Sequence, residues 1–307
     1  MRSRSLLVTL DAFNTLFHPR RPVPEQYAQT AHTFGLSPSL VTPESLQPAF
    51  KAAFKAHTKQ YPNYGRDLAV RGQYGGPRQW WAEVIEGSFA RVLGLAQGSN
   101  VSNQLPEGLV QRLLDRFASS EGYTLYPDVP EFMARMRDVK TRLAQQQVHH
   151  TLAFGSFERV IVGVMSNSDD RISVVLESLG LSVGDTRSDQ DVTSMRLPGF
   201  EERGSGEDSS HSKQLNDLDM IITSYDAGAE KPSRVIFDVA KRQAMRLTGS
   251  QDESAWVCVH AGDDFDKDYQ AAMDAGWEGF YIPREGTEKA GVRSLTELFD
   301  VLQAREA

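Results

Sequence analysis

The side chains that could do chemistry lie directly after apolar segments of strand length. Asp11 follows the apolar residues 6–10, and Thr15 comes four residues after it. Ser166 and Asn167 follow a second apolar run and offer a hydroxyl and an amide where we expect a helix to begin. Unpaired N–H groups point outward at the start of a helix, so this position suits an anion. We expect Asp11 to be a nucleophile, and Thr15 and Asn167 to contact the substrate.

Two further groups add a positive charge and metal-binding oxygens. Lys231 precedes Pro232, which we expect to be the first residue of a helix, so that a fixed cation can reach back over the edge of the sheet. The turn 263–268 gathers carboxylates after the apolar residues 256–261, and Mg²⁺ prefers such oxygen-rich ligation. Together with Asp11 and Ser166, these groups fit attack by a carboxylate on an electrophile that bears an anionic group.

Strands and helices that alternate along the chain must position these groups. Apolar runs predict buried strands at 6–10, 160–165, 220–223, 256–261 and 279–282. Amphipathic stretches predict helices at 170–180, 232–247 and 266–276. This alternation indicates an α/β fold with a doubly wound parallel sheet. The carboxyl ends of such strands meet at one edge, where open α/β sheets hold their sites.

Two segments depart from this alternation. Residues 19–122 have helical spacing in several places and no convincing buried strand, so they predict a separate helical unit. Residues 182–217 are rich in Ser, Asp, Glu and Gly and cannot bury enough apolar surface to offset their ordering entropy. We therefore predict a disordered insertion there. A chain of 307 residues is long enough for two folding units.

Composition and charge exclude several classes of protein. A net charge of -8 works against binding to nucleic acid or to an anionic membrane. No stretch approaches the roughly 20 apolar residues that cross a bilayer. The single Cys258 excludes a disulfide framework, and the basic residues 2–4 run straight into the first strand without a secretion signal. We expect a cytoplasmic or nuclear protein whose partners are small molecules or other proteins.

The chain resembles the haloacid dehalogenase-like hydrolase superfamily, whose four motifs it carries in order over nearly its full length. The motif residues are Asp11, Ser166, Lys231 and the carboxylate turn that begins at Asp263. Residues 13–16, 61–65, 78–81, 262–264 and 268–270 are also similar to the domain-containing 3 group of that superfamily.

The resemblance implies a fold and a set of residue roles. It implies a Rossmann-like core of residues 1–18 and 123–307, with an inserted α-helical cap of residues 19–122. Asp11 would form a covalent intermediate, Ser166 and Lys231 would hold the transferred group and the Asp11 carboxylate, and Asp11, Asp263 and Asp268 would position Mg²⁺. The implied activity is that of a Mg²⁺-dependent phosphatase, weak or specialised, with a phosphorylated small molecule as substrate.

One residue departs from the phosphatase pattern and leaves three functions open. Phosphatases of the superfamily carry Asp-x-Asp, and this chain has Phe13 in place of the second Asp. Dehalogenases of the superfamily have an aromatic residue there, which favours a 2-haloacid dehalogenase that needs no metal. The missing Asp also favours a non-catalytic binding protein that holds a phosphorylated ligand, or a protein partner through the cap or the insertion.

Overall fold

The computed structural model describes residues 4–95, 101–145, 154, 157–188, 215–285 and 290–304. These residues form two compact units. The described part of 19–124 makes up a helical unit, and the remaining described residues make up a unit built on a sheet. That the helical unit acts as a cap over a site stays a prediction.

Six parallel strands form the sheet, in the order β5-β6-β4-β1-β7-β8. Their bounds are β1 (Ser5–Leu10), β4 (Arg159–Ser166), β5 (Val183–Thr186), β6 (Leu218–Thr223), β7 (Trp256–Gly262) and β8 (Glu278–Tyr281). Successive strands are added first on one side of β1 and then on the other. This is the doubly wound, Rossmann-like arrangement that the sequence predicts, and the prediction is confirmed.

Strand β1 lies in the middle of the sheet and is buried along its whole length. Four of its six residues are Leu or Val, with apolar side chains on both faces, because helices cover both faces of a parallel sheet. The register aligns Leu10 with Val164 of β4 and with Ala261 of β7. The next residue, Asp11, therefore emerges between two neighbouring strands at the point where the strand order reverses.

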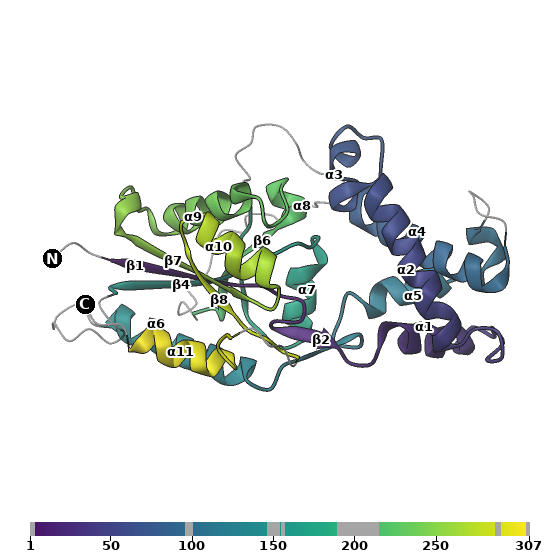
Figure 1. Ribbon diagram of the computed structural model, residues 1–307, viewed down its shortest axis with the longest axis horizontal. Coiled ribbons are helices and arrows are strands. Elements are labelled where there is room, and N and C mark those ends of the chain that lie inside the picture. Colours follow the sequence, from purple (N-terminus) through teal and green to yellow (C-terminus); the bar gives the residue numbers. More distant parts are fainter. Residues whose placement is uncertain are drawn as a thin grey trace, which may run out of the picture. The chain divides into compact units, whose positions relative to one another are not determined.

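Helices cover the two faces of the sheet (Figure 1). Helices α9 (Arg234–Thr248) and α10 (Ala271–Asp274) lie on one face, and α6 (Val129–Gln145) and α11 (Leu295–Gln303) lie on the other. Helix α7 (Arg171–Ser178) packs against β5 and β6. The buried side chains Ile236 and Phe237 of α9 pack with strand residues in one apolar core.

The helices near the site begin later than the sequence predicts. The helix predicted at 170–180 runs from Arg171 to Ser178, so Ser166, the last residue of β4, lies before the start of the helix and not at it. The helix expected at Pro232 begins at Arg234, because the side chain of Ser233 accepts a hydrogen bond from the N–H of Val235 and caps the helix there. The first start agrees with the prediction within one residue, whereas the second, at Pro232, is wrong by two residues.

Two other segments differ from their predicted structure. Strand β5 falls inside the segment 182–217, whose predicted disorder is wrong there because β5 pairs with β6. The greater part of that predicted insertion, 189–214, lies outside the described residues. The helix expected at 266–276 divides into a π-helical turn, η3 (Phe265–Gln270), and the short α10.

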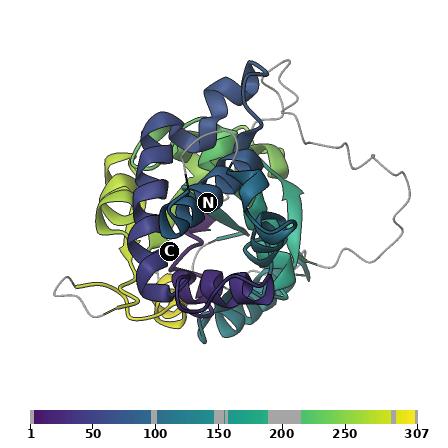
Figure 2. The ribbon, with the colours of Figure 1, turned by 90° about the vertical axis from the view of Figure 1, so that its right-hand side faces the viewer.

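The helical unit has five α-helices in its described part, α1 (Val23–Thr33), α2 (Pro43–Gln60), α3 (Pro62–Val70), α4 (Gly76–Leu93) and α5 (Leu109–Arg116), and a short 3-10 helix at Ser102–Gln104. Helices α2 and α4 pack side by side (Figure 2). Their interior side chains include the buried Trp80 and Phe89.

The short strands β2 (Phe17–Pro19) and β3 (Tyr123–Leu125) pair where the chain passes between the two units. None of the helices in the described residues is long and apolar enough to cross a bilayer.

Core packing against the sheet predicts a difference between two leucines. Leu176 of α7 is fully buried, whereas Leu247 of α9 is 45% exposed. Leu176→Ala is expected to lower the free energy of unfolding by about 2 to 5 kcal/mol, because it leaves a cavity. Leu247→Ala, the matched control, is expected to change it by less than about 1 kcal/mol. Urea unfolding of the full chain measures both, and equal losses would contradict the assigned core.

Candidate active site

The expected site residues meet at the carboxyl edge of the sheet. Asp11 follows β1, Ser166 ends β4, and Asp263 follows β7. Lys231 follows β6 and the short helix α8 (Ser224–Ala227). Parallel strands end at the same edge, so residues more than 200 positions apart in sequence become neighbours. The ammonium of Lys231 reaches Asp11 across 220 residues of sequence.

Lys231 is the cation at the centre of the site, and its side chain is only 2% exposed. Its Nζ donates to Asp11 Oδ1 at 2.8 Å, to Asp268 Oδ1 at 2.5 Å and to the carbonyl oxygen of Met165 at 2.9 Å. Burial alone would lower the pKa of Lys231, but the carboxylates of Asp11 and Asp268 outweigh it and raise the pKa to about 12. The lysine is therefore charged throughout the physiological range.

Asn167 holds the backbone of Lys231. Its Nδ2 donates to the carbonyl oxygen of Lys231 at 2.8 Å, and its Oδ1 accepts from the N–H of Lys231 at 2.6 Å. The amide thus fixes the position from which the lysine side chain extends. That Asn167 also contacts a substrate stays a prediction, as does a contact from the neighbouring Ser166, which is buried at the end of β4.

Thr15 connects the turn after β1 to the turn after β7. Its Oγ1 donates to Asp263 Oδ1 at 3.3 Å and accepts from the N–H of Asp263 at 3.1 Å. The turn itself is closed by the carbonyl oxygen of Ala12, which accepts from the N–H groups of Leu16 and Phe17. Thr15 therefore orients Asp263, and its predicted contact with substrate stays a prediction.

Arg284 fixes this turn from the other side. Its Nε and Nη2 donate to the carbonyl oxygen of Thr15 at 3.1 and 2.6 Å, and its Nη1 donates to Asp128 Oδ2 at 2.8 Å. The guanidinium lies 4.2 Å from the ring centroid of Tyr126. Asp128 also accepts from the N–H of Leu295 at 2.7 Å. Arg284 thereby joins the turn after β1 to the segment before α6.

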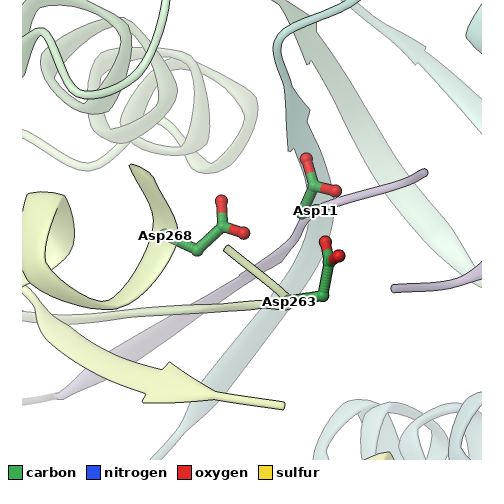
Figure 3. Close-up of side chains that lie close together, drawn as sticks. All are labelled: Asp11, Asp263 and Asp268. Carbon is green, nitrogen blue, oxygen red and sulfur yellow. The ribbon is translucent and has the colours of Figure 1, made fainter. Parts of the chain in front are cut away.

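Three carboxylates, those of Asp11, Asp263 and Asp268, converge at this edge of the sheet (Figure 3). Asp11, Asp263 and Asp268 each present an oxygen within 4.8 Å of the other two. Burial raises the pKa of Asp11 against the opposing effect of Lys231. Burial and then the charges of Asp11 and Asp268 raise the pKa of Asp263 to about 7. The crowding of like charges and the all-oxygen donor set fit a hard divalent cation such as Mg²⁺.

The carboxylate of Asp268 lies against Gly262, at a position where any larger residue would clash with it. A Cβ on Gly262 would lie 2.1 Å from Asp268 Oδ2. Asp268 Oδ2 accepts from the N–H of Asp264 at 2.9 Å, which brings the η3 turn back against the end of β7. Burial alone would raise the pKa of Asp268, but Lys231 and His260 together lower it below its ordinary range. Asp268 is therefore ionised.

Phe13 stands at the place of the second motif carboxylate. It is 41% exposed, and its ring lies edge-on to Phe17 at 6.0 Å between centroids. The next residue, Asn14, has a φ of 60°, a left-handed conformation that Asn adopts more readily than most residues. The aromatic side chain brings no proton donor to this position.

Sequence reasoning missed two residues of the site, Arg284 and His260. Arg284 lies just beyond β8, where no motif or periodicity marks it, and its contacts depend on the tertiary fold. His260 was placed within an apolar strand, and only its position three residues before Asp263 could have drawn attention to it.

Comparisons with known proteins agree with this geometry. No family model matches the chain. An uncharacterised hydrolase of Schizosaccharomyces pombe is 28% identical over 275 residues, which cover 90% of this chain and 89% of that protein. Haloacid dehalogenase-like hydrolase domain-containing protein 3 of Xenopus laevis is 25% identical over 276 residues, which cover 90% of this chain and 83% of that protein. A Bacillus subtilis structure described as a HAD-hydrolase bound to magnesium shares the fold, with a TM-score of 0.51, 13% identity and coverage of 98% of this chain and 99% of that one.

The fold and the order of the site residues define the class: the chain resembles the haloacid dehalogenase-like hydrolase superfamily. Within that class it is similar to the proteins named haloacid dehalogenase-like hydrolase domain-containing protein 3, over nine-tenths of its length. The resemblance inferred from the sequence is confirmed.

The raised pKa of Asp263 predicts a pH dependence of stability in the presence of chelator. Its folded pKa of about 7 exceeds the unfolded value of about 4, so the unfolded chain binds fewer protons between these pH values. Stability therefore falls as the pH rises from about 4 to about 7. Asp263→Asn is expected to remove this fall and to stabilise the chain at pH 8 by about 1 to 2 kcal/mol, once partial exposure is allowed for.

Urea unfolding at pH 4 and pH 8 checks this prediction. Asp238→Asn is the matched control, because Asp238 is exposed on α9. Its effect is expected to be small and the same at both pH values. A native chain as stable at pH 8 as at pH 4, with no gain in Asp263→Asn, would contradict the assigned electrostatics of the three carboxylates.

Proposed function

We propose that this protein is a Mg²⁺-dependent phosphatase that acts on a phosphorylated small molecule through a covalent intermediate on Asp11. The observation that carries the proposal is the buried Lys231, which fixes the Asp11 carboxylate beside Asp263 and Asp268. The Asp11 carboxylate is suited to attack a phosphate. The ammonium of Lys231 and a metal ion held by the carboxylate oxygens would neutralise the negative charge of that phosphate. The structure of the same fold that is described as bound to magnesium supports the choice of metal.

The site residues divide the reaction into two displacements at phosphorus. A carboxylate oxygen of Asp11 attacks the phosphorus atom, and the bond from phosphorus to the leaving oxygen breaks, with its electron pair departing on that oxygen. Water then attacks the phosphorus of the aspartyl phosphate, which releases phosphate and restores the Asp11 carboxylate. Lys231 holds Asp11 in place through Oδ1 in both steps. Asp11, Asp263 and Asp268 would hold Mg²⁺, which when bound neutralises charge on the phosphoryl oxygens.

Phe13 sets the kind of leaving group that this site favours. A general acid that protonates the leaving oxygen is worth roughly 10²- to 10⁴-fold in rate. The phenyl ring at this place cannot donate a proton. We therefore propose that the site favours phosphates whose leaving group departs readily as an anion, such as aryl phosphates, over alkyl phosphates.

A second candidate, a 2-haloacid dehalogenase, is favoured by one observation. Phe13 puts an exposed aromatic ring at the place where dehalogenases of the superfamily carry one. The carboxylate of Asp11 would displace halide from carbon in that reaction, without metal. Metal-independent release of chloride or bromide from small 2-halo acids would favour this function. A non-catalytic binding protein is the third alternative. Absence of both phosphatase and dehalogenase activity, together with stable binding of a ligand, would favour it.

Hydrolysis of p-nitrophenyl phosphate tests the phosphatase directly. The purified chain is expected to release p-nitrophenol with Mg²⁺ and not with chelator. Asp11→Asn is expected to lower the rate at least about 10³-fold, because it removes the nucleophile. The control Asp238→Asn, an exposed residue of α9, is expected to keep the native rate. Turnover that survives Asp11→Asn would overturn the mechanism.

The leaving-group preference gives a separate prediction. Phe13→Asp is expected to raise kcat/KM for an alkyl phosphate such as glycerol 2-phosphate by about 10²-fold or more, and to raise that for p-nitrophenyl phosphate much less. Phe13→Asn is the matched control, because it has the same size as Asp and cannot protonate an alkoxide. Equal gains from Asp and Asn would show that space, and not proton donation, limits the native chain.

A further inference from the structure

His260 is a fully buried histidine beside the carboxylate cluster. It lies on β7, and the register places it level with Thr9 of β1. Its Nδ1 is 2.9 Å from Thr9 Oγ1, and its Nε2 is 3.1 Å from Asp268 Oδ1. The ring also packs edge-on against Phe237, with 5.6 Å between centroids and 89° between the planes. Polar and apolar contacts together fix the orientation of the imidazole.

A count of protons decides which ring nitrogen carries hydrogen. The ammonium of Lys231 has three N–H groups, and they go to Asp11 Oδ1, Asp268 Oδ1 and the Met165 carbonyl at 2.5 to 2.9 Å. The separation of Nζ from His260 Nε2 is longer, at 3.4 Å. With no lysine proton left for it, Nε2 must itself be the donor to Asp268, since two acceptors would repel each other at 3.1 Å.

The other side of the ring agrees with this assignment. If Nε2 carries the proton of a neutral imidazole, Nδ1 is an acceptor and the hydroxyl of Thr9 donates to it. That contact, 2.9 Å, is shorter than the alternative from Thr9 Oγ1 to the carbonyl oxygen of Val259, 3.2 Å. A ring whose Nδ1 accepts from Thr9 and whose Nε2 donates to Asp268 carries one proton and is neutral.

We propose that His260 is a positioning residue that, as its Nε2–H tautomer, donates to Asp268 Oδ1 and fixes that carboxylate for metal binding. Lys231 donates to the same oxygen, and the N–H of Asp264 donates to Oδ2. Three donors from three segments thus remove the rotational freedom of the carboxylate. The role in metal binding rests on the proposed function, whereas the tautomer and the hydrogen bond do not.

The first test is nitrogen-15 NMR of the histidine rings in the intact native chain. The Nδ1 and Nε2 nitrogens differ in shift according to which carries the proton, and the signal lost in His260→Gln identifies His260 among the seven histidines. The expected result is a neutral ring with hydrogen on Nε2. Hydrogen on Nδ1 of the native ring would overturn the proposal, and the variant serves only to assign the signal.

The second test is calorimetric titration of two variants with Mg²⁺ alone. The variants differ in whether the side chain at position 260 is long enough to contact Asp268. His260→Gln keeps an amide N–H at about the place of Nε2, whereas His260→Asn is too short to reach Asp268. Partners that orient a ligand are typically worth about 10- to 100-fold in metal affinity. His260→Asn is expected to weaken Mg²⁺ binding about 10-fold or more, and His260→Gln to restore most of it.

The outcomes separate this proposal from the proposed function. Native affinity in a folded His260→Asn chain would overturn the positioning role, as would equal losses in the Asn and Gln variants. Mg²⁺ binding that follows the expected order, in a chain without phosphatase activity, would overturn the proposed function and leave the role of His260 standing. Absence of Mg²⁺ binding in the native chain would overturn both the metal and the role assigned here.

Discussion

The ammonium of Lys231, buried between two carboxylates, is the interaction on which the rest of the site depends. Removal of one partner from a buried ion pair typically costs about 3 to 5 kcal/mol, because the remaining charges lose their compensation. Here one cation compensates both Asp11 and Asp268. The peptide carbonyl of Met165 accepts from its third N–H, so the ammonium has no unsatisfied donor although the side chain is only 2% exposed. The arrangement requires Asp11, Met165 and Asp268, from three separate segments of the chain, to lie within hydrogen-bonding distance of Lys231 Nζ.

The sheet provides that convergence. Met165 lies in β4, Asp11 follows β1, Lys231 follows β6, and Asp268 lies in the turn after β7. These strands are neighbours in a parallel sheet, so their carboxyl ends lie side by side. Further contacts then fix each segment: Asn167 on the backbone of Lys231, Thr15 on Asp263, and Arg284 on the carbonyl of Thr15. Each segment is held by contacts from another element, which is how a fold gives rigid geometry to groups on loops.

The strands and the residues at their ends could be predicted from sequence because both are local signals. Apolar runs such as 160–165 and 256–261 are buried on both faces, and the polar residue that ends each run marks the edge. The contacts that orient these residues could not be predicted. The bond from Arg284 to Thr15 spans 269 residues, and the pairing of His260 with Thr9 depends on strand register. The start of α9 could not be predicted from Pro232, because the side chain of Ser233 caps the helix one residue later.

The same burial that makes Lys231 useful also hides it from reagents that modify amines. Acylation of lysine needs an accessible and unprotonated nitrogen, and Lys231 has a side chain 2% exposed and a pKa raised to about 12. Lys267, four residues after Asp263, has a side chain 53% exposed in the adjoining turn. A fluorophore or cross-linker that reacts with surface lysines would therefore modify Lys267 and leave Lys231 unmodified. The labelled protein would keep its buried charges.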